Sequence, residues 1–115
     1  MTGNFIYKIC AKKEWEDAVQ AGLYLGSEID LKDGFIHFST AKQAVETASK
    51  HFSGINGLVL IKIDSKGLGD ALKWEKSRND ALFPHLYEPL KPETAEWIVD
   101  LPLGNDGVHV FPPID

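Results

Sequence analysis

The chain has 115 residues, of which 43% are hydrophobic and 25% are charged, an ordinary composition that predicts one folded domain over residues 1–115. Its 12 Lys and Arg oppose 17 Asp and Glu, and the formal charge of -5 disfavours long DNA or RNA as partners, because such a surface repels phosphate backbones. Cys10 is the only cysteine, which excludes an intramolecular disulfide and a zinc site built on several thiolates.

The first segments predict a strand followed by a helix. Residues 5–9 are mostly aromatic and β-branched, as in a strand, and no signal peptide is expected before them. Because no apolar run approaches the roughly 18 residues of a membrane span, we expect a cytoplasmic protein with no membrane partner. A helix is predicted over residues 12–21, with Gly22 as its left-handed cap and a buried face made of Trp15, Ala18 and Val19.

The next segments predict a second strand and a second helix. Residues 23–29 are typical of an irregular segment or a weak strand, and Asp33-Gly34 predicts a turn. Residues 35–38 predict a strand that places Phe35, His37 and Ser39 on one face. Ser39 or Thr40 then caps a helix over residues 41–52, which Gly54 ends; its predicted buried stripe consists of Ala41, Ala44, Val45, Ala48 and Phe52.

The second half predicts mostly strands. Residues 58–63 form a nearly continuous apolar run, which favours a central strand buried on both faces. Residues 72–74 predict a short strand, residues 76–92 a proline-punctuated loop, and residues 96–101 another strand. Residues 105–107 predict a turn into a last strand over residues 108–111, giving a hairpin. The order β-α-β-α-β-β-β predicts an α+β fold with two helices.

Polar residues that suit an anion gather in two segments. His37 and Ser39 come just before a predicted helix start, where free backbone N–H groups favour a negative charge. The sole arginine, Arg78, lies near Lys73 and Lys76, and its planar fork binds phosphate or carboxylate in bidentate fashion. The plainer interpretations are a half-buried strand histidine beside an ordinary cap, and a solvated loop with an Arg78–Asp80 pair.

The segment Phe83-Pro-His-Leu-Tyr87 is unusual for a plain loop, because Pro84 restrains two aromatic residues and a histidine. Such rings stack on a base or on nicotinamide, and His85 can act as acid, base or donor. A small satellite core beneath the loop is the alternative. The four histidines lack metal-ligand spacing, so no metal is expected, and Cys10 is interpreted as a small buried hydrophobe.

Four stretches resemble the bacterial family called domain of unknown function 952, in order and over nearly the whole chain. They are residues 6–9 (IYKI), 30–40 (DLKDGFIHFST), 72–75 (LKWE) and 83–87 (FPHLY). That family's fold is similar to the ADP-ribosyltransferase superfamily, which includes RNA 2'-phosphotransferases. The resemblance implies a split, mostly antiparallel pair of sheets with a cleft for NAD.

The resemblance also implies roles for individual residues. In that superfamily the first strand presents a His or Arg, matched here by Lys8; the second element presents Tyr or Ser, matched by His37-Phe-Ser39; and a late strand supplies a Glu, matched by Glu96, with Glu75 as competitor. The usual triads are therefore not intact. The predicted catalytic residues are Glu75, His37, His85 and Glu96, and the predicted cofactor-binding residues are Lys8, His37, Ser39, Thr40, Arg78 and Tyr87.

Three functional hypotheses follow from the sequence. The leading one is an ADP-ribosyltransferase-like domain that binds NAD or a related nucleotide in a cleft, with a non-standard triad if it transfers ADP-ribose. The second is a non-enzymatic binding module for a small phosphorylated or acidic metabolite. The third is a regulatory protein that binds a partner through residues 83–87.

Overall fold

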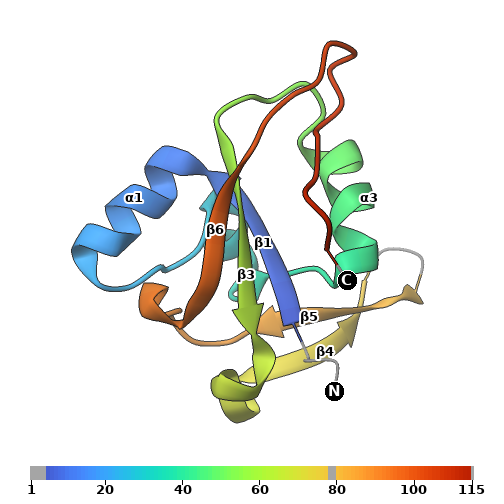
Figure 1. Cartoon of the computed structure of the whole chain (residues 1–115). Helices are drawn as coiled ribbons and strands as arrows, with labels where there is room; N and C mark the ends of the chain where they lie inside the picture. Colours follow the sequence, from blue (N-terminus) through green and yellow to red (C-terminus); the bar gives the residue numbers. More distant parts are fainter. Residues whose placement is uncertain (1–4, 78–79, 115) are drawn as a thin grey trace.

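Two three-stranded antiparallel sheets form the frame of the structure (Figure 1). This computed structural model describes residues 5–77 and 80–114. The first sheet has the order β1-β3-β6, with strands Phe5–Ala11, Leu58–Asp64 and Ala95–Leu101. The second has the order β2-β5-β4, with strands Ile36–His37, Leu82–Leu86 and Leu72–Lys76. The predicted α+β class and the split, antiparallel arrangement of the strands are confirmed.

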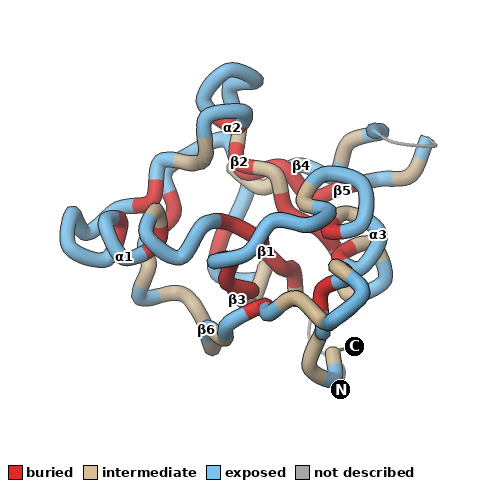
Figure 2. The backbone as a smooth tube through the Cα atoms, turned by 90° about the horizontal axis from the view of Figure 1, so that it is seen from above, coloured by how far each residue is buried: buried red, intermediate tan, exposed pale blue. Residues whose placement is uncertain are grey.

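The first sheet is covered on both faces, as the apolar run in β3 predicted. Side chains of β3 alternate, so that Ile61 and Ile63 join one buried cluster and Leu58 and Leu60 join another. Helix α1 (Lys12–Ala21) packs on the first face and α3 (Ala41–His51) on the second. Figure 2 shows these two helices on opposite sides of β1. The central position of β3 is thereby confirmed.

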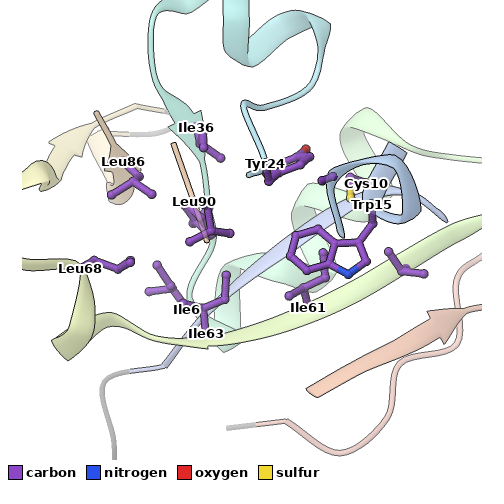
Figure 3. Close-up of a cluster of buried hydrophobic side chains, with 13 residues drawn as sticks. Ile6, Cys10, Trp15, Tyr24, Ile36, Ile61, Ile63, Leu68, Leu86 and Leu90 are labelled. Carbon is purple, nitrogen blue, oxygen red and sulfur yellow. The ribbon is translucent and has the colours of Figure 1, made fainter. Parts of the chain in front are cut away.

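The larger buried cluster joins the two sheets (Figure 3). Ile6 of β1 and Ile63 of β3 meet Ile36 of β2 and Leu86 of β5, all of them at most 3% exposed. A backbone bridge adds to this junction, because Tyr7 N donates to Ser39 O at 2.7 Å and Ser39 N donates to Tyr7 O at 2.9 Å. β1 therefore contacts the second sheet directly where the chain leaves β2.

The two predicted helices are present, but some of their caps and buried residues differ from those predicted. Gly22 closes α1 at φ 87°, as predicted, and Thr40 rather than Ser39 caps α3 through a capping box with Gln43. Val19 and Val45 are 53% and 51% exposed, so their predicted burial is wrong. The faces that touch the sheet consist mainly of Trp15 and small alanines. α3 ends at His51 with Phe52 as its C-cap, so Gly54 lies in the following turn rather than at the cap.

A third helix, α2 (Glu28–Asp33), stands where the sequence predicted an irregular segment or weak strand and then a turn. Its first turn is closed by a capping box in which Ser27 and Asp30 bond reciprocally. Ile29 and Leu31 are 55% and 63% exposed, so the helix lacks the apolar stripe that periodicity detects. Within residues 5–77 and 80–114, no helix is long and apolar enough to cross a membrane.

The predicted loop over residues 76–92 is wrong, because β4 extends to Lys76 and β5 occupies Leu82–Leu86. Pro84 fits the centre of this sheet because its carbonyl accepts from Phe38 N at 3.0 Å, a contact that needs no proline N–H. Phe83 to Leu86 are buried and only Tyr87 is exposed, so the expected exposed contact loop at 83–87 is not present. Two 3-10 helices, Ser65–Ala71 and Pro92–Thr94, precede β4 and β6.

The predicted strand over residues 108–111 is also wrong. The chain turns at Asn105 to Gly107 as expected, but Leu103 and His109 form only an isolated bridge. Pro102 and Pro112 flank the turn and remove N–H donors that a longer ladder would need. His109 instead bonds through Nε2 to Ile55 O at 2.7 Å, which ties this segment to the loop before β3.

Candidate functional site

A cavity of about 560 Å³ lies at the junction of the two sheets. Its walls come from the consecutive elements α2, β2 and the second half of α3, together with β1 and β5, which are distant from them in sequence. Four of the predicted site residues line it, namely Lys8, His37, Ser39 and His85. Apolar walls are supplied by Ile29, Phe52 and Phe83. The volume lies in the range of roughly 300–1,000 Å³ that is typical of small-molecule sites.

A buried ion pair holds one side of this cavity. Lys8 Nζ lies 2.7 Å from Asp30 Oδ2 and donates to His37 O at 3.0 Å, and both charged side chains are at most 6% exposed. Asp30 also accepts from Ser27 N at 2.9 Å and from His37 N at 3.1 Å. One carboxylate therefore joins β1, the start of α2 and β2. The Lys8 ammonium donates to these two acceptors, Asp30 and the His37 carbonyl, and so holds both in place at the cavity wall.

The Asp30 carboxyl has a lowered pKa. Burial by itself raises its pKa, but the hydrogen bond from His37 and the charge and hydrogen bond of Lys8 outweigh burial. The pKa of Asp30 is therefore held well below its usual range. Asp30 remains a carboxylate, which is the state that satisfies the buried Lys8 ammonium.

The low pKa of Asp30 predicts a steep loss of stability in acid. The unfolded aspartate titrates near about 3.9, so the contribution of Asp30 is full above that pH and is lost as pH falls towards the lower folded pKa. We expect this group to reduce the free energy of unfolding by up to about 1.4 kcal/mol per pH unit below pH ~3.9. Urea unfolding between pH 2 and 6 measures it. Asp30→Asn lacks the titration, and an equal acid slope in this variant would contradict the assignment.

His37 lies between two carboxylates. Its Nδ1 donates to Asp30 Oδ1 at 2.5 Å, and its Nε2 lies 3.0 Å from Asp33 Oδ2. The ring is one-third exposed, and it contacts Phe35 at a centroid distance of 4.6 Å. The sequence pattern favoured an anionic ligand at His37. The structure shows instead that aspartates of α2 already occupy both ring nitrogens.

A second polar cluster is built on β4 and β5. His85 and Lys73 face one another in the register, and His85 Nδ1 lies 2.8 Å from Glu75 Oε1. The Tyr87 hydroxyl donates to the same oxygen at 2.7 Å. The bonds from His85 and Tyr87 lower the pKa of Glu75, and the bond to Glu75 raises the pKa of Tyr87. Glu75 thus touches His85 rather than the cavity.

Phe35 connects the two polar clusters. It stacks on His85 with a centroid distance of 4.1 Å and an interplanar angle of 26°, and it contacts Tyr87 at 5.2 Å. His37 and His85 meet edge to face at 5.4 Å. They are also cross-strand partners in the β2–β5 register. Alternation along residues 35–39 predicted correctly that Phe35 and His37 share a face.

The remaining predicted site residues are dispersed. The Ser39 hydroxyl bonds to Thr47 Oγ1 at 3.0 Å at the cavity wall, whereas the Thr40 hydroxyl caps α3 and does not line the cavity. Tyr87 is 46% exposed beside Glu75. Glu96 is exposed on β6, which β3 separates from β1. Arg78 lies outside the described residues.

Two expectations change with this placement. The start of α3 is closed by its capping box, and the cavity borders the second half of that helix, at Thr47 and His51. The helix N-terminus, where Ser39 and Thr40 suggested an anion site, thus does not border this cavity. Asp30 and Asp33 were missed as site residues, although the spacing Ser27-x-x-Asp30 was a visible capping signal.

Cys10 is confirmed as a buried residue, 2% exposed, and burial raises the pKa of its thiol to about 12. A thiol with that pKa carries no appreciable thiolate near neutral pH. In the part of the chain that the structure describes, no group of three or more His, Cys, Asp or Glu side chains is arranged to hold a metal ion.

Gly26 is the backbone position on which the Asp30 network depends. Its φ is 110°, and a Cβ there would lie 2.6 Å from Asp30 Cβ. Gly22 has a similar φ of 87° with nothing within 4 Å, so it is a matched control. Gly22→Ala is expected to cost about 1–2 kcal/mol from backbone strain alone. Gly26→Ala should cost more than that in urea unfolding, and equal losses would show that the contact with Asp30 is unimportant.

Fold and site together define a class: an α+β protein of two antiparallel sheets with a cavity at their junction, walled by a buried Lys–Asp pair and two facing histidines. The chain belongs to the family described as "protein of unknown function (DUF952)", whose model matches residues 9–98. No curated protein matches the chain.

Solved structures of one relative have the same fold. The crystal structure of protein CC0527 from Caulobacter crescentus has a TM-score of 0.90 and 48% identity, over 93% of this chain and 94% of that chain. The solution NMR structure of CC0527 has a TM-score of 0.82 and 49% identity, over 90% of each chain. The crystal structure of a double mutant of CC0527 also matches, with a TM-score of 0.90, 47% identity, and 93% and 94% coverage.

Proposed function

We propose that the chain binds NAD or a related small nucleotide in the cavity at the junction of the sheets. One observation carries the proposal: His37 and Ser39 from one segment and His85 from β5 converge on a single cavity of about 560 Å³. Such convergence of polar groups on an apolar-walled cavity is the usual form of a small-molecule site. The resemblance to ADP-ribosyltransferase-like proteins supplies the ligand class.

The chemistry of the walls suits the nicotinamide end of such a ligand. Phe52 and Phe83 supply aromatic residues to the cavity wall, which suit a flat ring, and Asp33 adds a carboxylate to the wall. Cleavage of the nicotinamide–ribose bond develops positive charge on the ribose, which a nearby carboxylate stabilises. In this proposal Lys8 positions Asp30 and His37 rather than touching phosphate, and Arg78 is the candidate phosphate ligand.

Calorimetric titration with NAD, ADP-ribose and nicotinamide tests the proposal. We expect saturable binding that Phe83→Ala weakens at least tenfold, because Phe83 forms part of the cavity wall. Glu16→Gln, an exposed change on α1, is the control and should bind like the parent. Absence of binding at millimolar concentrations would contradict the proposal, as would equal weakening by both variants.

A non-enzymatic binding module for a small phosphorylated or acidic metabolite is the second candidate. It is favoured by the engagement of the described carboxylates near the cavity: Asp30 bonds to Lys8 and His37, Asp33 lies against His37, and Glu75 bonds to His85. Product analysis after incubation with labelled NAD separates the two. Release of nicotinamide supports the transferase-like function, and binding without release supports the module.

A further inference from the structure

We propose that His85 accepts a proton through Nε2 from a water molecule or hydroxyl group in the cavity, with Glu75 and Tyr87 as its positioning residues. This inference rests on the proposed function, because it assigns the base and the class of nucleophile to the same site. The inference adds a chemical step to ligand binding: either hydrolysis of the bound ligand or transfer of part of the ligand to a hydroxyl group.

The contact with Glu75 selects the tautomer of His85. A carboxylate only accepts hydrogen bonds, so the nitrogen that faces Glu75 Oε1 at 2.8 Å carries the proton. That nitrogen is Nδ1, which leaves a lone pair on Nε2. Among residues 5–77 and 80–114, no hydrogen bond reaches Nε2 of His85. His85 is 5% exposed and lines the cavity, so its free acceptor is available to a group bound there.

Three contacts fix the His85 ring and its carboxylate. Phe35 stacks on one face of the ring at 4.1 Å, and His37 meets it edge to face at 5.4 Å. The Tyr87 hydroxyl holds Glu75 Oε1 at 2.7 Å. A base held in this way is already oriented before the ligand arrives, as in catalytic sites where a third group orients the base.

The other histidines are less suited to this role. His37 Nδ1 donates to Asp30 and its Nε2 lies 3.0 Å from Asp33, so carboxylates face both nitrogens. His109 Nε2 is bonded to Ile55 O. His51 lines the cavity from the exposed end of α3, but no carboxylate in the described parts of the chain orients its ring. His85 alone combines burial, an oriented Nδ1–H and an open Nε2 among the described histidines.

With an NAD-type ligand the step balances without a further reactant. The bond between ribose C1' and the nicotinamide nitrogen breaks, and its electron pair neutralises the pyridinium charge, so the leaving group needs no proton. A water oxygen forms the new bond to C1' and gives one proton to His85 Nε2. The products are nicotinamide and ADP-ribose, and the proton leaves His85 to solvent.

Nitrogen-detected NMR of the ¹⁵N-labelled free protein tests the positioning directly. We expect His85 as the Nδ1–H tautomer, and conversion towards the Nε2–H tautomer in Glu75→Ala. An Nε2–H tautomer in the parent would overturn the proposal. This measurement needs no ligand, so it separates a failure of the base from a failure of the proposed nucleotide binding.

Nicotinamide release from NAD tests the chemical role. We expect His85→Gln to lower kcat by about 100-fold or more while NAD affinity changes less than about threefold, in keeping with the usual effect of a general base. Glu75→Gln should lower kcat less and shift the acidic limb of its pH profile, a change that a purely structural residue would not produce. Release at the parental rate by a folded His85→Gln, or binding by the parent without any release, would overturn the proposal.

Discussion

Replacement of Asp30 by alanine is expected to lower the free energy of unfolding by about 3–5 kcal/mol. The substitution leaves the Lys8 ammonium buried without its partner, at a side-chain exposure of 6%. It also removes the acceptor for Ser27 N and for two donors of His37. The total free energy of unfolding of an ordinary domain is about 5–15 kcal/mol, so this one carboxylate accounts for a large share of it.

Urea unfolding followed by tryptophan fluorescence at pH 7 measures the Asp30→Ala effect. Asp33→Ala is the matched control, because Asp33 contacts the same histidine but its side chain is 38% exposed. The control should lose no more than about 1 kcal/mol, as is usual for an exposed ion pair. Similar losses in the two variants would contradict the structural role given to the buried pair.

Leu86→Ala is the second large change, with an expected loss of about 2–5 kcal/mol. Leu86 is 1% exposed, and it packs with Ile36 and Ile63 in the cluster that joins the sheets (Figure 3). A cavity at this place loosens the junction and the strand that carries His85. The same unfolding measurement applies.

Leu82→Ala controls for the Leu86→Ala effect. It makes the same substitution on the same strand, but Leu82 is 52% exposed. A surface change of this kind usually stays within about 0.5 kcal/mol. If Leu86→Ala lost no more than Leu82→Ala, the junction cluster would not be the core that stabilises the second sheet.

Long periodic or continuous apolar segments made most of the fold predictable. The run in β3 indicated a central strand, and Gly22 marked the end of α1. Elements without an apolar pattern were missed. α2 is stabilised by polar capping while its apolar residues face solvent, and β5 contains a proline whose carbonyl alone is needed for pairing. Tertiary pairing therefore decided β5, whereas α2 depends on a local capping box that apolar periodicity does not detect.

The sequence predicted which strand residues belong to the candidate site, but it did not predict the side chains that bond to them. Side-chain alternation placed Phe35 and His37 on one face, and the unusual segment 83–87 pointed to His85. The aspartates that hold His37 come from a helix that was not predicted, so their proximity depended on the fold. Glu96 matched the late-strand carboxylate by order along the chain, but β6 lies at the outer edge of the first sheet, away from β1.

The most direct test of nucleotide binding at the sheet junction is an NMR titration of the ¹⁵N-labelled chain with NAD. Binding at this site should produce saturable shifts in the signals of Ser39, Thr47 and His85, which line the cavity on three separate segments. Signals from the exposed face of α1, such as Glu16, should stay in place. Shifts confined to α1 or to the outer face of β6, or no shifts at millimolar NAD, would contradict it.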